Sequence, residues 1–377
     1  MQRRHNPGEH HIRVARLTPC IRPRVRDARR AIRDGRRVVD AKQCWEHALA
    51  GSAWLLRHQR PDGSWEDLPD PQLGAFYKGS WAFALTGQPT AAHRLLNHVR
   101  ERYMTPDGDF VPRTSFIHQA AHYLYINAYL VIGGMAVGRY EIALPALRFL
   151  MAQQDARNGG FFSIPTPPGG SGGTDTISTT AAGVACLAAG QLTTATRAGD
   201  YLVSLLERQH DTTTGFYTAL TPDGALDTAA AESEARWWRV IDLHAPDQCW
   251  YALGLPFAFL VLLHQATERT AYRSAAEGYC ALLERCVNPW EGPSSGKAAW
   301  GCAMLYRITG EARYRELALR VARYIIGHQE ADGHWVLAKV RGMPVAAVLD
   351  SVDFDVTAEY TLWLGLIASH ILARDRE

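Results

Sequence analysis

Lysine is scarce in this chain, and paired aspartates are missing from it. Of the 40 basic residues among 377, only four are lysines, at Lys42, Lys78, Lys297 and Lys339. No two aspartates are consecutive anywhere in the sequence, so the chain lacks a DDxxD-type cluster that could hold magnesium ions against a diphosphate. Metal-assisted ionisation of a diphosphate is therefore disfavoured.

Cysteine pairs and long apolar runs are also missing. The seven cysteines are scattered, odd in number and never spaced as Cys-x-x-Cys, which argues against a disulfide framework and favours buried thiols. The longest uncharged apolar stretch, Cys249–Leu263, is too short to span a bilayer, and no apolar core typical of a secretory signal is found near the start. We expect a soluble, cytoplasmic protein without a transmembrane segment.

Positive charge is concentrated at the start of the chain. Residues 1–40 contain twelve arginines and four acidic residues, whereas the remainder contains 28 basic and 34 acidic residues. This contrast predicts an Arg-rich, disordered segment over residues 1–40, with a nucleic-acid-binding arm as the alternative. One folded domain is expected over residues 41–377. Because that domain is mildly acidic, no nucleic-acid partner is expected.

An internal repeat is the strongest pattern that is present. Gln59-Arg-Pro-Asp-Gly-Ser-Trp65 and Gln329-Glu-Ala-Asp-Gly-His-Trp335 both follow an amphipathic helix that ends in aromatic and aliphatic residues. Weaker copies follow other helix ends, at residues 103–110, 154–162, 209–217 and 286–292. Six similar helix ends indicate a repeat protein.

The segments between the repeat elements predict six pairs of helices. The first helix of each pair carries charged residues on one side and apolar residues on the other, as expected of an outer ring that faces water. These helices are expected at residues 41–59, 89–104, 140–154, 192–209, 270–286 and 311–329.

The second helix of each pair is apolar nearly all round, so it must be buried. These helices are expected to begin near Leu73, Phe116, Asp175, Asp247, Ser295 and Asp355. Two such rings make an all-α fold, an (α/α)6 toroid. A linear superhelical solenoid is the alternative, with pairs more uniform in length.

The Gln-x-x-x-Gly-x-Trp element resembles the repeat of squalene–hopene cyclases and other class II terpene cyclases, and the protein prenyltransferase β subunits share the toroid. In that superfamily the Gln amide ties helix ends together and the Trp ring packs over it. The resemblance implies this scaffold over nearly the whole domain. Because the motif is structural, carrying the chemistry over is an analogy.

In a toroid, the loops that lead into the inner helices surround the mouth of a central funnel. Residues at the starts of these helices are therefore the candidate lining, and their many aromatic rings suit an apolar or cationic guest. The candidates are Tyr77, Lys78, Trp81, His118, His122, Asp175, Thr179, Asp247, Trp250, Tyr251, Lys297, Trp300, Asp353, Asp355, Glu359 and Tyr360.

The most acidic element among these candidates is Asp353-Phe-Asp355, followed by Glu359. The resemblance implies a carboxylic acid here that protonates an alkene or epoxide, because class II cyclases carry a DxDD motif at this cavity. Val356 stands where the motif ends in an acid, which puts standard cyclisation in doubt. The alternative is structural: Asp355 would cap the last helix, and Glu359 would complement its dipole.

Asp247-Gln-Cys249 resembles the pair of zinc ligands in prenyltransferase β subunits. No histidine stands at the start of a following inner helix to complete the ligand set, so we expect no metal and no cofactor. An Asp cap and a buried thiol are the simpler interpretation. Lys78 and Lys297 fall at the openings of inner helices, where they could hold an anionic group.

His118 and His122 are expected four residues apart on one inner helix, facing the same way, where they could bind a metal or act as acid and base. The segment 223–246, which includes Trp237, is a candidate lid.

The sequence favours a terpene-cyclase-like cyclase or isomerase acting on an apolar isoprenoid or polyketide-like substrate. Asp353 or Asp355 would be the general acid, and developing positive charge would be stabilised by aromatic rings, at Trp81, Trp250, Trp300 and Tyr360.

Two alternatives remain open. The first is a carbohydrate-active toroid such as an epimerase, uronide hydrolase or lyase, in which His118, His122, Asp175 and Arg236 would act. The second is a catalytically silent small-molecule-binding protein. In each case the partner is a small molecule, and the oligomeric state is left open.

Overall fold

A computed structural model describes residues 39–377 apart from 67, 69–71, 114–117, 120–121, 210, 338 and 340–350. Residues 1–38, which make up nearly all of the expected Arg-rich segment, lie outside the described residues.

Twelve helices of seven residues or more alternate between an outer and an inner position in the described chain. The outer helices are α2 (Ala41–Arg57), α4 (Pro89–Tyr103), α7 (Tyr140–Met151), α9 (Leu192–Glu207), α12 (Thr270–Arg285) and α14 (Ala312–Gly327). The inner helices are α3 (Gly79–Leu85), α6 (Tyr123–Ala136), α8 (Thr176–Ala188), α11 (Tyr251–Thr267), α13 (Gly296–Thr309) and α16 (Ser351–Arg374).

Minor elements lie in the loops that lead into the inner helices. They are η1 (Leu73–Ala75), η2 (Thr228–Glu232), α10 (Arg236–Arg239) and four short strands. β1 (Thr174–Asp175) pairs antiparallel with β3 (Ala219–Leu220), and β2 (Gly215–Tyr217) pairs antiparallel with β4 (Val240–Asp242).

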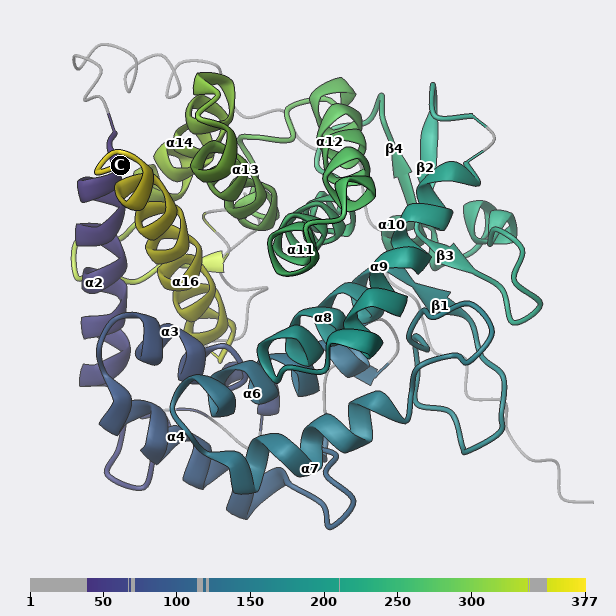
Figure 1. The fold of residues 1–377 in the computed structure, drawn as a ribbon. Coiled ribbons are helices and arrows are strands. Elements are labelled where there is room, and N and C mark those ends of the chain that lie inside the picture. Colours follow the sequence, from purple (N-terminus) through teal and green to yellow (C-terminus); the bar gives the residue numbers. More distant parts are fainter. Residues whose placement is uncertain are drawn as a thin grey trace, which may run out of the picture. The chain divides into compact units, whose positions relative to one another are not determined.

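The inner helices form a closed ring. Each one contacts the next, in the order α3, α6, α8, α11, α13 and α16, and α16 returns to contact both α3 and α2 (Figure 1). A linear solenoid has no contact between its first and last repeats. The fold is therefore the predicted (α/α)6 toroid.

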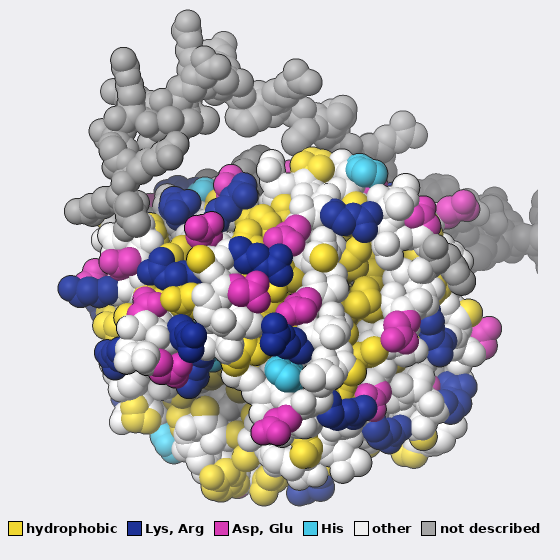
Figure 2. Space-filling model, turned by 45° about the horizontal axis from the view of Figure 1, so that its top comes forward, with side chains coloured by type: hydrophobic (Ala, Val, Ile, Leu, Met, Phe, Trp, Pro, Cys, Tyr) yellow, Lys and Arg dark blue, Asp and Glu magenta, His cyan; other side chains and the backbone are white. Residues whose placement is uncertain are grey.

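The outer and inner helices differ in how their buried side chains are distributed. In α14, buried residues recur at helical spacing, at Tyr314, Ala318, Val321 and Ile325. In α8, every residue from Thr176 to Cys186 is buried. Acidic and basic side chains are interspersed over the face in Figure 2, as expected where amphipathic helices face water.

The repeated glutamines join neighbouring outer helices. The side-chain Nε2 of Gln59 donates to the carbonyl of Ala91 in α4 at 3.0 Å, and that of Gln154 donates to Thr194 in α9 at 3.0 Å. Nε2 of Gln329 donates to His47 in the first outer helix, also at 3.0 Å. The last repeat thus bonds to the first and helps to close the ring.

Several inner helices start away from their predicted positions. The segment after Leu73 forms η1 and a turn before α3 begins at Gly79, and α6 begins at Tyr123 instead of near Phe116, which lies outside the described residues. Asp355 lies in the second turn of α16, which begins at Ser351, so the prediction that Asp355 caps this helix is wrong.

One described helix, Val352–Arg374, passes the length and composition test for a membrane span. It forms most of α16, and 67% of its most apolar window is buried inside the protein. Its apolar character matches its position in the inner ring.

The glycine of the repeat is required by close packing. Gly63 has φ +87°, and a Cβ there would lie 2.0 Å from the carbonyl oxygen of Arg94. Gly87 has a similar φ of +76°, but no atom lies within 4 Å of the position its Cβ would take.

We predict that Gly87→Ala costs about 1–2 kcal/mol of folding free energy because of its left-handed backbone. Gly63→Ala should cost about 1–3 kcal/mol more, since it also crowds the outer ring. Urea unfolding of the two variants measures the difference. Equal losses would show that the joint is not tightly packed.

Candidate functional site

A cavity of about 630 Å³ opens among the loops that precede the inner helices. Of the sixteen candidate residues that the sequence predicts, eleven line it. They are Tyr77, Lys78, His118, His122, Asp247, Trp250, Tyr251, Lys297, Asp355, Glu359 and Tyr360.

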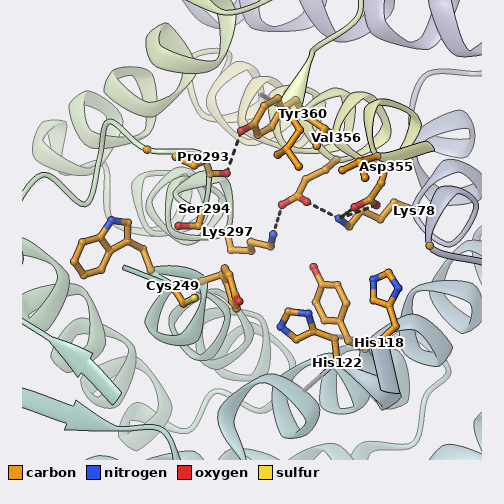
Figure 3. A pocket seen from close by; sticks show the side chains of 18 of the residues that line it. Lys78, His118, His122, Cys249, Pro293, Ser294, Lys297, Asp355, Val356 and Tyr360 are labelled. Carbon is orange, nitrogen blue, oxygen red and sulfur yellow. Dashed lines mark hydrogen bonds and ion pairs between the residues drawn. The ribbon is translucent and has the colours of Figure 1, made fainter. Parts of the chain in front are cut away.

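Four charged side chains form one cluster in the wall of this cavity. Lys78 Nζ lies 2.9 Å from Oδ1 and 3.1 Å from Oδ2 of Asp355, and it also donates to Glu359 Oε2. Lys297 Nζ donates to the other carboxylate oxygen of Glu359 (Figure 3). Glu359 therefore bridges two ammonium groups that are 3% and 5% exposed.

The helices explain how these four side chains meet. Asp355 and Glu359 are four residues apart, so they share one face of α16. Lys78 is the residue before α3, and Lys297 lies in the first turn of α13. Because α16 packs between α3 and α13, its acidic face meets a lysine on each side.

Burial and pairing set the pKa values within this cluster. Burial raises the pKa of Glu359, but Lys297 and Lys78 outweigh it, so the pKa is held well below its ordinary range. Burial lowers the pKa of Lys78, but Asp355 and Glu359 reverse this and raise it.

The other two members of the cluster shift toward their neutral forms. Burial lowers the pKa of Lys297, although Glu359 partly opposes the change. Burial raises the pKa of Asp355 despite its contact with Lys78, and the charge of Glu359 adds to the rise. The neutral forms of Lys297 and Asp355 are therefore favoured relative to the free side chains.

Aromatic rings surround the two ammonium groups. Nζ of Lys78 lies 4.7 Å from the ring centre of Tyr77, and Nζ of Lys297 lies 5.5 Å from Tyr251 and 5.3 Å from Trp363. Aromatic faces attract cations, and here they take the place of water around the lysines.

His118 and His122 both line the cavity, opposite Lys78, Lys297 and Asp355 (Figure 3). The premise that they share one helix is wrong, because α6 begins at Tyr123 and His122 only precedes it. Burial lowers the pKa of His118 to about 4, with Lys78 and Arg113 adding to the effect. Burial likewise lowers the pKa of His122 to about 3. Both imidazoles are neutral near pH 7.

A buried polar network ties down the segment that carries these histidines. Arg113 donates to the carbonyl of Tyr123 at 2.7 Å and to Asp109 at 3.1 Å. Asp109 also accepts from Tyr123 Oη at 2.5 Å and from Asn127 Nδ2 at 2.9 Å. Gln119 donates back to the carbonyl of Arg113 at 2.5 Å. The network holds backbone on both sides of His122.

Five predicted site residues do not line the cavity. Asp353 accepts a hydrogen bond from the backbone of Leu337 at 3.0 Å, Asp175 caps α8, and Thr179 accepts from the backbone of Phe161 at 2.9 Å. The rings of Trp81 and Trp300 lie 5.9 Å apart in an aromatic cluster that also contains Trp363.

The Asp247-Gln-Cys249 element lines the cavity, but it does not form the predicted cap, and the Cys249 thiol is only partly buried. The residue before α11 is Trp250, so Asp247 is not its cap, and Asp247 itself has φ +56°. Among the described residues, no three His, Cys, Asp or Glu side chains converge as metal ligands.

Sequence reasoning missed other residues of the lining. Tyr125 lies inside the apolar run of α6, where nothing in its pattern separates it from core residues. Trp237, in the expected lid segment, lines the cavity while 48% exposed. Arg236 lies instead in a neighbouring hollow, 3.7 Å from Asp242.

Comparison with known proteins supports the fold. No protein-family model matches the chain, and no curated protein matches it. Among solved structures, a D-mannose isomerase aligns with a TM-score of 0.64 at 12% identity, over 86% of this chain and 97% of its own.

Two further structures indicate the range of activities on this fold. The α-1,6-mannanase GH76A of Salegentibacter sp. HEL1_6 aligns with a TM-score of 0.61 at 13% identity, over 88% of this chain and all of its own. A variant of the type II terpene cyclase MstE from Scytonema, bound to its product merosterolic acid A, aligns with a TM-score of 0.54 at 15% identity. The alignment covers 88% of this chain and 98% of the cyclase chain.

The chain thus has the α/α toroid fold that carbohydrate-active enzymes and a terpene cyclase also have. At these identities the likeness shows the fold, and it does not single out the squalene–hopene cyclases.

We predict that Lys78→Met lowers the free energy of unfolding by about 3–5 kcal/mol, because it leaves the carboxylate of Asp355 without its lysine partner and removes one of the two lysines from Glu359. Lys42 pairs with Glu46 at 3.7 Å on the surface, so Lys42→Met should cost at most about 0.5 kcal/mol. Chemical denaturation compares the two. Similar small losses would mean that the cluster is well solvated.

Proposed function

We propose that this protein is an enzyme that moves a proton within a polar, hydroxyl-bearing substrate, as sugar isomerases and epimerases do. The observation that carries the proposal is the cavity wall. It sets two neutral imidazoles, His118 and His122, opposite a buried cluster of lysines and carboxylates.

The lining favours a polar substrate over a hydrocarbon. A hydrocarbon would remove water from Asp355 and Glu359, which are 20% and 13% exposed, without offering them a hydrogen bond. The hydroxyl groups of a sugar can bond to these charged groups. The ring of Trp237, which also lines the cavity and is half exposed, can pack against the apolar face of a sugar.

The site contains the groups that an isomerisation needs. A neutral imidazole can accept the proton from the carbon beside a carbonyl group, and Nε2 of His122 is buried without a hydrogen-bond partner among the described residues. Lys297, whose pKa is lowered, can donate a proton to the carbonyl oxygen. Return of the proton to the former carbonyl carbon, while the hydroxyl on the neighbouring carbon gives its proton back to Lys297, gives an isomer. Return to the other face of the same carbon, while the enol hydroxyl gives its proton back to Lys297, gives an epimer.

The comparisons favour isomerisation over glycoside hydrolysis. The D-mannose isomerase and the α-1,6-mannanase share the fold. An inactive variant of that mannanase, crystallised with α-1,6-mannotetraose, has two adjacent aspartates replaced. This chain has no adjacent aspartates, so the same hydrolytic pair is not available to it.

A terpene-cyclase-like reaction is the second candidate, and Asp355 favours it. Burial raises the pKa of this carboxyl group, as a proton donor to an alkene requires. The bound product in the type II terpene cyclase supports an apolar substrate on this fold. We rank it second because Asp355 is bonded to Lys78.

To test the proposal, the protein is incubated in D2O with a set of unmodified hexoses, mannose first, and the sugars are followed by NMR. We expect deuterium to enter the carbon beside the carbonyl group as the isomer forms. His122→Asn should lower kcat at least about 100-fold by removing the base. His93→Asn, on outer helix α4, is the control. Turnover of squalene-like hydrocarbons but not of sugars would select the second candidate, and turnover of neither would favour a binding protein.

A second variant moves His118 without changing its chemistry. A Cβ at Gly74 would lie 2.5 Å from Cε1 of that imidazole, so Gly74→Ala must displace the ring. We predict a fall in kcat of at least about tenfold with little loss of stability, because misplaced groups react slowly. The control is Gly327→Ala, where no atom lies within 4 Å of the new methyl group. Unchanged kcat in Gly74→Ala would exclude a role for His118.

A further inference from the structure

We infer that this cavity selects an uncharged substrate and rejects phosphorylated or carboxylated ones, with Glu359 as the residue that sets this preference. The inference rests on the proposed function, because it concerns the substrate of the same site. Its basis is a count of the charges that line the cavity and of the partners they already have.

Both lysines of the cavity already have carboxylate partners. Lys78 contacts Asp355 and Glu359, and Lys297 contacts Glu359. Their remaining surroundings are aromatic, at Tyr77 for the first and Tyr251 for the second. An incoming anion would have to compete with these carboxylates for the two ammonium groups.

The rest of the lining adds negative charge. Asp247 and Glu291 are exposed at the cavity, and the two histidines are neutral near pH 7. No arginine is among the residues that line the cavity in the described part of the chain. Four carboxylates and two ammonium groups therefore line the cavity, and one of the four carboxylates, that of Glu291, is paired with Arg320.

The surrounding helices account for this excess of carboxylates. Helices α3, α11 and α13 begin at the cavity, and the positive ends of their dipoles stabilise negative charge there. The carboxylates that line the cavity are already stabilised by these helix dipoles. A phosphate or carboxylate on the substrate would add like charge to a set that has no unpaired cation.

Glu359 controls the balance because it alone contacts both lysines. In Glu359→Gln, Lys297 loses its only carboxylate partner in the described structure, while Lys78 keeps Asp355. Without Glu359, Lys297 loses the charge that opposes the fall of its pKa, so an anion bound there would supply the missing partner of its ammonium form. The substitution should therefore convert a cavity that rejects anions into one that accepts them.

The first experiment is isothermal titration calorimetry of the wild-type protein at pH 7 with D-mannose, D-mannose 6-phosphate, D-mannuronate and inorganic phosphate. We expect the two charged sugars to bind at least tenfold more weakly than the neutral one, and phosphate not to bind. Charged sugars that bind as tightly as the neutral one, or wild-type protein that binds phosphate, would overturn the inference.

The second experiment uses Glu359→Gln, with Glu291→Gln as the matched control. Glu291 lines the same cavity but pairs with Arg320 at 2.8 Å, so its loss frees no buried lysine. Glu359→Gln should bind inorganic phosphate at least tenfold more tightly than either the wild type or the control. A folded Glu359→Gln protein that gains no phosphate binding contradicts the inference.

If Glu359→Gln does not fold, as judged by circular dichroism, the wild-type titrations with the neutral and charged sugars decide the inference. These outcomes are separable from the proposed function. Absence of sugar turnover in the wild type rejects the proposed function, whereas the phosphate measurements test the charge argument whatever the reaction is.

Discussion

The closure of the inner ring is the constraint on which the rest of this structure depends. Helices such as α8 and α16 are apolar over most of their surface, so each must be covered on every side. A ring with outer helices around it achieves this for all of them. Closure also places the last inner helix beside the first, which brings Glu359 to Lys78, 281 residues away in the chain.

The buried charges follow from this geometry. Two lysines and two carboxylates at the mouth of the ring would each be costly to bury alone, and together they neutralise one another. Their arrangement also limits the chemistry. The two lysines that could have bound an anion are already paired with carboxylates. Asp355, which could have been a free proton donor, is paired with Lys78.

Much of the site could be predicted because toroid loops gather the starts of inner helices at one place. That rule found Lys78, Lys297, Asp355 and Glu359 without showing that they touch. It failed for Asp175 and Asp353, which use their carboxylates on nearby backbone. It also failed for Trp81, which points into the aromatic core. The position of a residue near a helix start can be predicted from the sequence. The direction of its side chain depends on the residues packed around it.

The sequence by itself determined the architecture, because helical periodicity and the Gln-Gly-Trp joints are local patterns that repeat along the chain. Only the tertiary structure decided the character of the cavity. Whether a lysine is free or paired, and whether a histidine is charged or neutral, depends on burial and on partners that lie up to 281 residues away. Such pairs leave no local pattern, because the physical cause is the packing of α16 against helices from both ends of the chain.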